Sequence, residues 1–178
     1  MDIHNPKAAS YAQFHSSKTD LILQEIESET ILNHPHSHML SGSVQGKLLE
    51  MISRMINPLK VLEIGTFTGY SAICLSKGLQ EKGELHTIEI REDDALKAAS
   101  YFQKAGLDQI IRQHIGNAKE IIPTLNEKWD LVFIDADKVS YIDYYELTLP
   151  YIKSGGWMIV DNVLFHGQVL EDQIKGKI

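Results

Sequence analysis

The sequence has 178 residues, of which 43% are hydrophobic, 23% charged and 8% aromatic. This composition fits one globular domain and excludes a coiled coil, a collagen-like repeat and a disordered chain, because the apolar fraction is large enough for a core. No run reaches the ~18 to 20 apolar residues that a membrane span needs. The net charge of −7 disfavours nucleic acid as a partner, since an acidic protein repels a phosphate backbone.

The first residues of the chain and its cysteine content indicate the cellular compartment of the protein. The first residues, MDIHNPKAASYAQF, lack the apolar segment of a secretory signal. The one cysteine, Cys74, cannot form an internal disulfide, and its apolar neighbours indicate a buried side chain rather than a nucleophile. We therefore expect a cytoplasmic protein with no membrane association.

Residues 1–40 are polar and helix-prone. The spacing of apolar residues predicts an amphipathic helix over residues 20–32 and a second helix over residues 43–56. The intervening NHPHSHML segment contains a proline and reads as a loop. Without a cysteine or a further histidine nearby in sequence, its histidines are interpreted as solvated loop residues rather than transition-metal ligands; they are His34, His36 and His38.

From residue 60 onward, short apolar or β-branched runs alternate with helical stretches. The runs are KVLEIG, ELHTIEI, QIIRQHIG, DLVFIDAD and GGWMIVDN. This alternation predicts a Rossmann-like α/β domain with a parallel sheet and crossover helices, preceded by the N-terminal helical segment. Ligands bind such sheets at the carboxyl ends of the strands, so we expect the site residues where these runs end.

The first two strand ends predict a nucleoside-type cofactor site. Gly65 allows a tight turn, and Gly69 would let the next helix start close to the strand. Phe67 occupies the place of the middle glycine in the dinucleotide fingerprint, which disfavours a nicotinamide dehydrogenase. Glu89 ends the second strand, where an acidic residue typically binds ribose hydroxyls. A ligand with a ribose and a carboxylate but no phosphate, such as S-adenosylmethionine, would fit. The alternative is that Gly65 and Gly69 are only turn residues and that Glu89 is a solvated residue at the end of a strand.

The last two strand ends predict a metal site. Asp135 ends the fourth strand, and Asp161 and Asn162 end the fifth. Adjacent parallel strands lie roughly 4.8 Å apart, so these side chains can converge. Two carboxylates and an amide are hard oxygen ligands, as expected for Mg²⁺, Ca²⁺ or Mn²⁺. The alternative is that Asp135 caps the following helix and that Asp161 and Asn162 form a turn.

Taken together, the motifs EIGTFTGYS, IEI, GNA, FIDADK and DNVLFHG resemble the cation-dependent class I O-methyltransferases. This is the caffeoyl-CoA O-methyltransferase group with its bacterial relatives, and catechol O-methyltransferase is a more distant cousin. The resemblance runs from about residue 38 to residue 169 and implies a single S-adenosylmethionine-dependent domain over residues 1–178 with strand order 3-2-1-4-5. Relatives continue with a helix and two more strands, strands 6 and 7. We therefore expect a truncated or partly observed chain. If those strands were absent, the fifth strand would be an edge that exposes Trp157 and Ile159.

The resemblance also implies roles for individual residues. Asp135, Asp161 and Asn162 would hold the divalent cation. Lys138 would be the general base beside Asp135, although a solvent-facing lysine is the alternative, and Asp135 and His166 would contact the substrate. Glu89 would hold the ribose, Ala118 the adenine and Asp137 the ammonium group of the cofactor. The complete set of implied cofactor contacts is Ser41, Glu63, Gly65, Thr66, Ser71, Glu89, Ala118 and Asp137.

The expected activity is methyl transfer from S-adenosylmethionine to one hydroxyl of a vicinal diphenol, a catechol or caffeoyl-type small molecule, with a divalent metal. Family members are usually homodimers, so we expect a homodimer here. One alternative is a class I methyltransferase of another substrate class, but DADK stands where the amino-group enzymes carry NPPY or DPPY. The other is a non-catalytic S-adenosylmethionine-binding domain, which the presence of both metal-type carboxylates and Lys138 disfavours.

Overall fold

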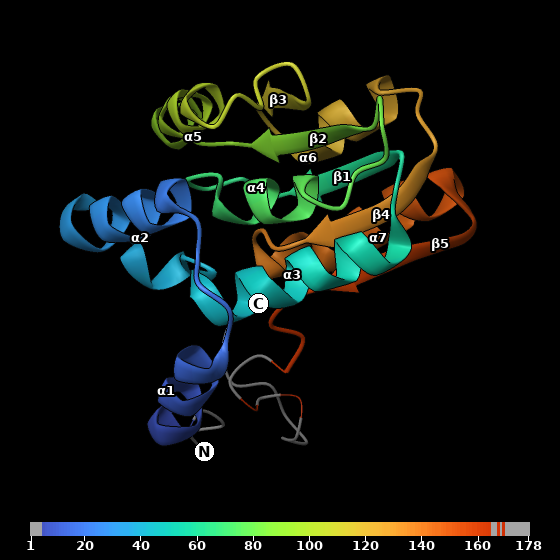
Figure 1. The fold of residues 1–178 in the computed structure, drawn as a ribbon. Coiled ribbons are helices and arrows are strands. Elements are labelled where there is room, and N and C mark those ends of the chain that lie inside the picture. Colours follow the sequence, from blue (N-terminus) through green and yellow to red (C-terminus); the bar gives the residue numbers. More distant parts are fainter. Residues whose placement is uncertain (1–4, 165–166, 168, 170–178) are drawn as a thin grey trace.

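The expected parallel sheet is present in a computed structural model that describes residues 5–164, 167 and 169. Its five strands lie in the order β3-β2-β1-β4-β5, and neighbouring strands pair in parallel. This confirms the Rossmann-like α/β class and the strand order 3-2-1-4-5 (Figure 1). The strands are β1 (Lys60–Ile64), β2 (Glu84–Glu89), β3 (Ile111–Ile115), β4 (Trp129–Ile134) and β5 (Ile152–Val160).

Helices cover both faces of the sheet (Figure 1). One face carries α2 (Leu21–Asn33), α3 (Gly42–Ile56), α4 (Tyr70–Ser76) and α5 (Glu92–Lys104), and the other carries α6 (Ala118–Ile121) and α7 (Tyr141–Thr148). Helix α1 (Pro6–His15) stands away from the sheet (Figure 1). Short 3-10 turns are η1 (Ser37–Met39), η2 (Ile122–Thr124), η3 (Lys138–Ser140) and η4 (Leu149–Tyr151). None of the helices in the described ranges is long and apolar enough to cross a membrane.

The two helices predicted in the N-terminal part are observed as α2 and α3. Helix α3 ends where the sequence places a stop signal. Asn57 adopts a left-handed conformation with φ 50°, and its N–H donates to the Ser53 carbonyl at 2.8 Å. Pro58 follows and cannot continue the helix. The chain therefore turns directly from α3 into β1.

Strand β4 packs against apolar clusters on both faces of the sheet, and this packing holds its carboxyl end in place. Leu131 and Phe133 belong to the apolar cluster under α2 to α5, whereas Trp129, Val132 and Ile134 belong to the cluster under α6 and α7. All five are at most 1% exposed. Continuous apolar runs of this kind are typical of strands buried on both faces. Residues that follow β1 and β4 are thus held by two close-packed cores.

Strand β5 forms the outer edge of the described sheet. Trp157 lies opposite Leu131 and is 58% exposed, as expected for an edge strand. Ile159 lies opposite Phe133 and is partly buried against the adjoining apolar cluster. The predicted exposure is therefore confirmed for Trp157 and holds only in part for Ile159.

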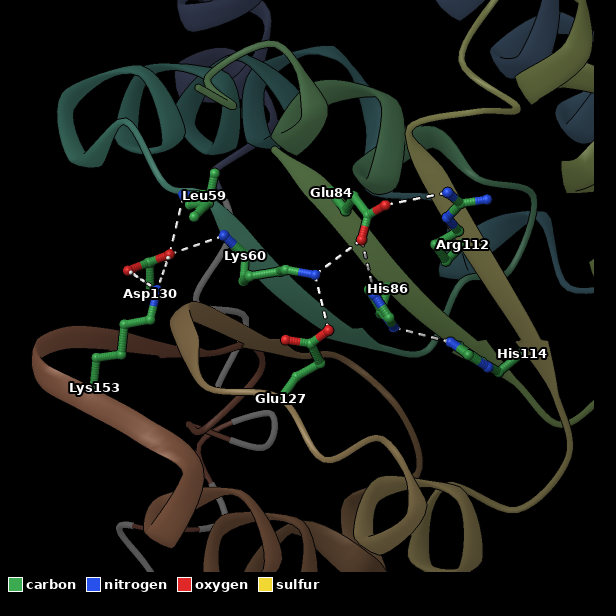
Figure 2. A network of polar contacts seen from close by, with 9 residues as sticks. All are labelled: Leu59, Lys60, Glu84, His86, Arg112, His114, Glu127, Asp130 and Lys153. Atoms are coloured by element: carbon green, nitrogen blue, oxygen red, sulfur yellow. Dashed lines mark hydrogen bonds and ion pairs between the residues drawn. The ribbon is translucent and has the colours of Figure 1, made fainter. Parts of the chain in front are cut away.

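The amino ends of the strands carry a network of ion pairs (Figure 2). Lys60 Nζ lies 2.9 Å from carboxylate oxygens of both Glu84 and Glu127, and Arg112 Nη2 donates to Glu84 at 3.1 Å. At the start of β4, Asp130 pairs with Lys153 at 2.8 Å and also accepts two backbone N–H groups, from Leu59 and Lys60. Each of these carboxylates thus has a cationic partner.

Candidate functional site

The opposite, carboxyl ends of β1, β2, β4 and β5 surround a cavity of about 910 Å³. A cavity of this size is within the range of small-molecule and cofactor sites. Most of the residues that the sequence singled out line it: Ser41, Gly65, Thr66, Ser71, Glu89, Ala118, Asp135, Asp137, Lys138, Asp161 and Asn162. Glu63 is completely buried behind this lining, and His166 lies outside the described residues.

The turn after β1 depends on a glycine. Gly65 has φ +101°, and a Cβ at this position would lie 2.1 Å from the carbonyl oxygen of Asp135, so no larger residue fits. Gly69 also has positive φ, but its close neighbours are in α5: a Cβ there would lie 2.6 Å from the Phe102 ring. The prediction that Gly69 allows close approach of the helix to the strand is therefore wrong, because the contact is with a neighbouring helix.

Glu89 is fixed at the mouth of the cavity by two backbone donors. The N–H of Phe67 donates to Oε2 at 2.7 Å and the N–H of Arg91 donates to Oε1 at 3.0 Å. Phe67 adopts a left-handed conformation, with φ 49°, where the dinucleotide fingerprint would have glycine. A carboxylate oxygen has two lone pairs. Glu89 can therefore accept further hydrogen bonds from two ligand hydroxyls.

Glu63 lies among hydroxyl groups in a site closed to water. Its Oε2 accepts from Thr87 Oγ1 at 2.6 Å, and Thr87 Oγ1 lies 2.5 Å from Thr66 Oγ1. Burial raises the pKa of Glu63 to about 8, and the hydroxyls of Ser71 and Thr87 oppose this shift. No group in the described ranges completes a hydrogen bond to Oε1. Because the raised pKa keeps Glu63 mostly protonated near neutral pH, this oxygen can carry the proton.

Asp135 and Asp161 lie side by side because they directly follow Ile134 and Val160, which are paired across β4 and β5. Burial raises the pKa of Asp135; Lys138 opposes the shift and the nearby Asp161 adds to it. Lys138 Nζ donates to Asp135 Oδ1 at 3.0 Å and also bonds the hydroxyl of Tyr141, so Lys138 is part of the site.

Asp161 is held by a residue that the sequence interpretation did not identify. Gln45 Nε2, on α3, donates to Asp161 Oδ2 at 2.8 Å. The N–H of Asn162 donates to Asp161 Oδ1 at 2.6 Å, and Asn162 itself has φ 54°. A single glutamine in an amphipathic helix carries no recognisable signal, and its partner is 116 residues away in the chain. Only the packing of α3 beside the strand end reveals this contact.

The capping role considered for Asp135 falls to Asp137. Asp137 Oδ1 accepts from the N–H of Ser140 at 2.9 Å and caps η3, while Oδ2 accepts from the Tyr144 hydroxyl at 2.6 Å. Burial works against ionisation, yet these two hydrogen bonds lower the pKa of Asp137. It is therefore an ionised carboxylate at the cavity wall, suited to a cationic group of a ligand.

The donor set for a metal is two carboxylates and an amide. Among the described residues, no three or more His, Cys, Asp or Glu side chains gather where they could hold a metal. At the carboxyl ends of β4 and β5, a cation could use Asp135, Asp161 and Asn162, with its other positions filled by water or substrate oxygens. Oxygen ligands of this kind suit Mg²⁺, Ca²⁺ or Mn²⁺ and do not suit soft transition metals.

The cysteine and histidine predictions have different outcomes. Cys74 is 1% exposed, and burial raises the pKa of its thiol to about 12, which confirms a buried and unreactive side chain. In the loop before α3, the prediction of solvated histidines is wrong for His34, whose Nε2 lies 2.8 Å from Asp94 Oδ1. The rings of His36 and His38 are exposed. The loop is close enough to α5 for one ring to reach a carboxylate that sequence distance conceals.

Comparison with known proteins identifies relatives over most of the chain. The family described as O-methyltransferase matches residues 13–177. The chain is 32% identical over 173 residues to the probable caffeoyl-CoA O-methyltransferase 1 of Dictyostelium discoideum, a match that covers 94% of this chain and 75% of that protein. It is 34% identical over 132 residues to the catechol O-methyltransferase of Niastella koreensis, which covers 72% of this chain and 60% of that protein.

Solved structures of O-methyltransferases are also similar to this chain. The O-methyltransferase TomG of Streptomyces achromogenes, in complex with S-adenosylmethionine (SAM), superimposes with a TM-score of 0.85 at 33% identity, covering 94% of this chain and 76% of that one. The O-methyltransferase of Bacillus cereus, in complex with S-adenosylhomocysteine (SAH), has a TM-score of 0.86 at 29% identity, covering 94% and 79%.

Proposed function

Because the chain belongs to the O-methyltransferase family, we propose that it methylates one hydroxyl of a vicinal diphenol, with S-adenosylmethionine as the donor and a divalent cation in the site. The observation that carries this proposal is the adjacent pair of carboxylates, Asp135 and Asp161, at the edge of the cavity that Glu89 also lines. Two of the relatives are named for caffeoyl and catechol groups, and both groups carry adjacent hydroxyls.

The chain's residues fit the donor. When bound, S-adenosylmethionine supplies an electrophilic methyl group on a sulfonium centre. Glu89, fixed by two backbone N–H groups, would accept the ribose hydroxyls, and the ionised Asp137 would face the ammonium group. Ala118 would line the adenine pocket. Glu63 lies behind this lining, and its Oε1 has no hydrogen-bond partner among the described residues. Further contacts would come from Ser41, Gly65, Thr66 and Ser71.

The residues also fit a cation. When bound, a divalent cation supplies Lewis-acid activation of a hydroxyl. Asp135, Asp161 and Asn162 would hold it, and Gln45 would keep Asp161 in place. Two neighbouring carboxylates repel one another, which favours a cation between them.

Lys138 is placed to serve as the general base. Its Nζ lies 3.0 Å from Asp135 and therefore next to the proposed metal position. Lys138 would act as the neutral amine, a form that a neighbouring divalent cation favours over the ammonium. It would accept the proton of the acceptor hydroxyl while the oxygen attacks the methyl carbon and the bond from this carbon to the donor sulfur breaks, releasing S-adenosylhomocysteine. Asp135 would contact the same hydroxyl, and we propose His166 as a further substrate contact.

An acceptor panel tests the proposal. Catechol and a caffeoyl ester would be compared with resorcinol and phenol, using donor labelled in the methyl group. We expect turnover only with adjacent hydroxyls, its loss on addition of EDTA, and recovery with excess Mg²⁺. Asp161→Ala should lose about 100-fold or more in turnover, whereas the control Asp143→Ala, an exposed carboxylate paired with Lys119, should not. Full activity of Asp161→Ala that ignores the chelator would contradict the metal role.

We also propose a domain organisation, an oligomeric state and a cellular location for the protein. We place one methyltransferase domain over residues 1–178, with residues 1–40 as its N-terminal helical segment, acting as a homodimer in the cytoplasm. Helix α1 supports an assembly role because Tyr11 and Phe14 are 67% and 84% exposed. Sedimentation equilibrium measures the assembly: a dimer that becomes a monomer in Phe14→Asp is expected, and a monomeric wild type would contradict it.

A further inference from the structure

One histidine joins the N-terminal segment to the cofactor end of the sheet. His34 follows α2, and its Nε2 lies 2.8 Å from Asp94 Oδ1 in the first turn of α5. The backbone N–H of His36 points to the other ring nitrogen, Nδ1, at 3.0 Å. A backbone N–H can only donate, so Nδ1 is the acceptor and Nε2 carries the hydrogen that goes to Asp94. Both nitrogens of His34 are therefore used, and its ring is held in one orientation.

From Asp94, charged contacts continue to the carboxylate of Glu89. Arg91 Nε lies 2.6 Å from Asp94 Oδ2 and 3.5 Å from Glu89 Oε1. Asp94 and Glu89 are 6% and 4% exposed, so water competes little at the two carboxylates, although the side chain of Arg91 is 36% exposed. Because Arg91 stands between two carboxylates, the position of Asp94 influences how the guanidinium meets Glu89.

A second set of contacts connects His34 with Glu89 Oε2. The His34 ring meets the Phe67 ring edge to face, with centroids 4.6 Å apart, and the Arg91 guanidinium lies 5.4 Å from the centre of the Phe67 ring. Phe67 is the left-handed residue whose N–H donates to Glu89 Oε2. Packing on its ring therefore supports an unusual backbone conformation at the donor.

From these two sets of contacts we infer that His34 is a positioning residue for Glu89, and that it sets the affinity for the nucleoside part of the methyl donor. His34 is not among the residues that line the cavity, so it acts through Asp94, Arg91 and Phe67. The inference rests on the proposed function, because it takes Glu89 as the ribose-binding carboxylate.

Binding of S-adenosylhomocysteine, measured by isothermal titration calorimetry, tests this inference. We expect His34→Ala to weaken binding by about 3- to 10-fold, since the hydrogen bond to Asp94 and the ring contact are lost. The control is His36→Ala, which keeps the backbone N–H that bonds His34 and removes an exposed ring whose centroid lies 5.8 Å from that of His34. The control should bind like the wild type.

Two conservative variants separate positioning from general stability. Glutamine places an amide N–H near the position of Nε2, so His34→Gln should keep the contact with Asp94 but lose the ring that packs on Phe67. We expect its binding to lie between that of the wild type and that of His34→Ala. Asparagine offers an acceptor near Nδ1 but is too short to reach Asp94, so His34→Asn should bind as weakly as His34→Ala. In turnover, we expect His34→Ala to raise KM for the donor and leave KM for the acceptor and kcat near wild type.

Glu89→Gln, measured in parallel, distinguishes the two levels of the proposal. Lost binding in Glu89→Gln with wild-type binding in a folded His34→Ala would overturn the inference and leave the proposed function intact. Unchanged binding in Glu89→Gln would overturn the role of Glu89 itself. Should His34→Ala fail to fold, the comparison of His34→Gln with His34→Asn decides, and equal affinities in these two variants would overturn the inference.

Discussion

The two ends of the sheet hold their carboxylates in opposite ways. At the amino end, Glu84 contacts both Lys60 and Arg112, and the side chains form a continuous set of ion pairs (Figure 2). At the carboxyl end, the donors are mainly neutral: backbone N–H groups on Glu89, a hydroxyl on Glu63 and a side-chain amide on Asp161. Lys138 on Asp135 and Arg91 near Glu89 are the cations that approach this end.

The pKa shifts of Glu84, Glu63 and Asp135 follow this difference, whereas Asp137 at the carboxyl end has a lowered pKa because, despite burial, hydrogen bonds from Tyr144 and Ser140 hold it ionised. Hydrogen bonds from Lys60 and Arg112 lower the pKa of Glu84 to about 2, whereas burial raises the pKa of Glu63 to about 8 and also raises that of Asp135. Carboxylates paired with cations are held ionised and stabilise the fold, whereas buried carboxyl groups without a cationic partner cost stability. The amino end of the sheet is therefore structural, and the carboxyl end carries the groups suited to chemistry.

The largest effect on turnover among the following variants is expected for Lys138→Ala. Removal of a general base typically costs about 100-fold or more in turnover, while SAH binding should stay at the wild-type level. Rates measured with saturating donor and metal give the first quantity, and calorimetry gives the second. Wild-type turnover in Lys138→Ala would leave Lys138 as a structural partner of Asp135 and Tyr141.

Loss of the Gln45 amide should weaken the metal site. Gln45→Ala removes the donor that orients Asp161, and loss of such outer partners typically costs about 10-fold in metal affinity. Metal titration of turnover and direct Mn²⁺ titration should give the same shift. Gln80→Ala is the control, because Gln80 bonds a backbone carbonyl on the surface. An unchanged Mn²⁺ affinity in Gln45→Ala would remove Gln45 from the site.

The buried Glu63 should make stability fall as the pH rises. Its folded pKa of about 8 lies above its ordinary value of 4.5, so between these values the folded state binds more protons than the unfolded state. The free energy of unfolding should therefore decrease from pH 5 to pH 8. Glu63→Gln removes the titrating group and should flatten this slope in denaturant melts. A wild-type slope in Glu63→Gln would contradict the raised pKa.

At the amino end we expect the smallest change. Lys60→Ala leaves Glu84 and Glu127 without their shared cation, which should lower the free energy of unfolding by about 1 kcal/mol. SAH binding should not change, because the network lies at the other end of the strands. Lys18→Ala is a surface control. A clear loss of SAH affinity in Lys60→Ala would erase the functional distinction between the two ends.

Much of the fold could be predicted because its signals are local. Five apolar runs with helical stretches between them indicate a parallel sheet, and its order follows from the family resemblance. The family and the enzyme class, an S-adenosylmethionine-dependent O-methyltransferase, are likewise confirmed by the relatives. Strand adjacency also explains why Asp135 and Asp161 could be brought together from sequence alone, since their strands are neighbours.

Contacts between distant segments could not be predicted. Gln45 meets a partner 116 residues away and His34 one 60 residues away, and neither side chain has a local pattern that marks it. The sequence predicts that Gly69 lets a helix lie close to a strand, whereas in the structure a Cβ at Gly69 would meet α5. Glycine spacing does not reveal the position of α5. The contacts of Gln45, His34 and Gly69 depend on how the helices pack on the sheet and on one another.

Binding of Mn²⁺, followed by electron paramagnetic resonance, probes the metal site alone, because it needs neither donor nor acceptor. We expect one specific Mn²⁺ site in the wild type, from which Mg²⁺ displaces the bound ion. Asp161→Ala should lose this site, and Asp143→Ala should retain it. Equal Mn²⁺ binding in the wild type and Asp161→Ala, or no specific binding in the wild type, would contradict the assignment of a metal to the carboxyl end of the sheet.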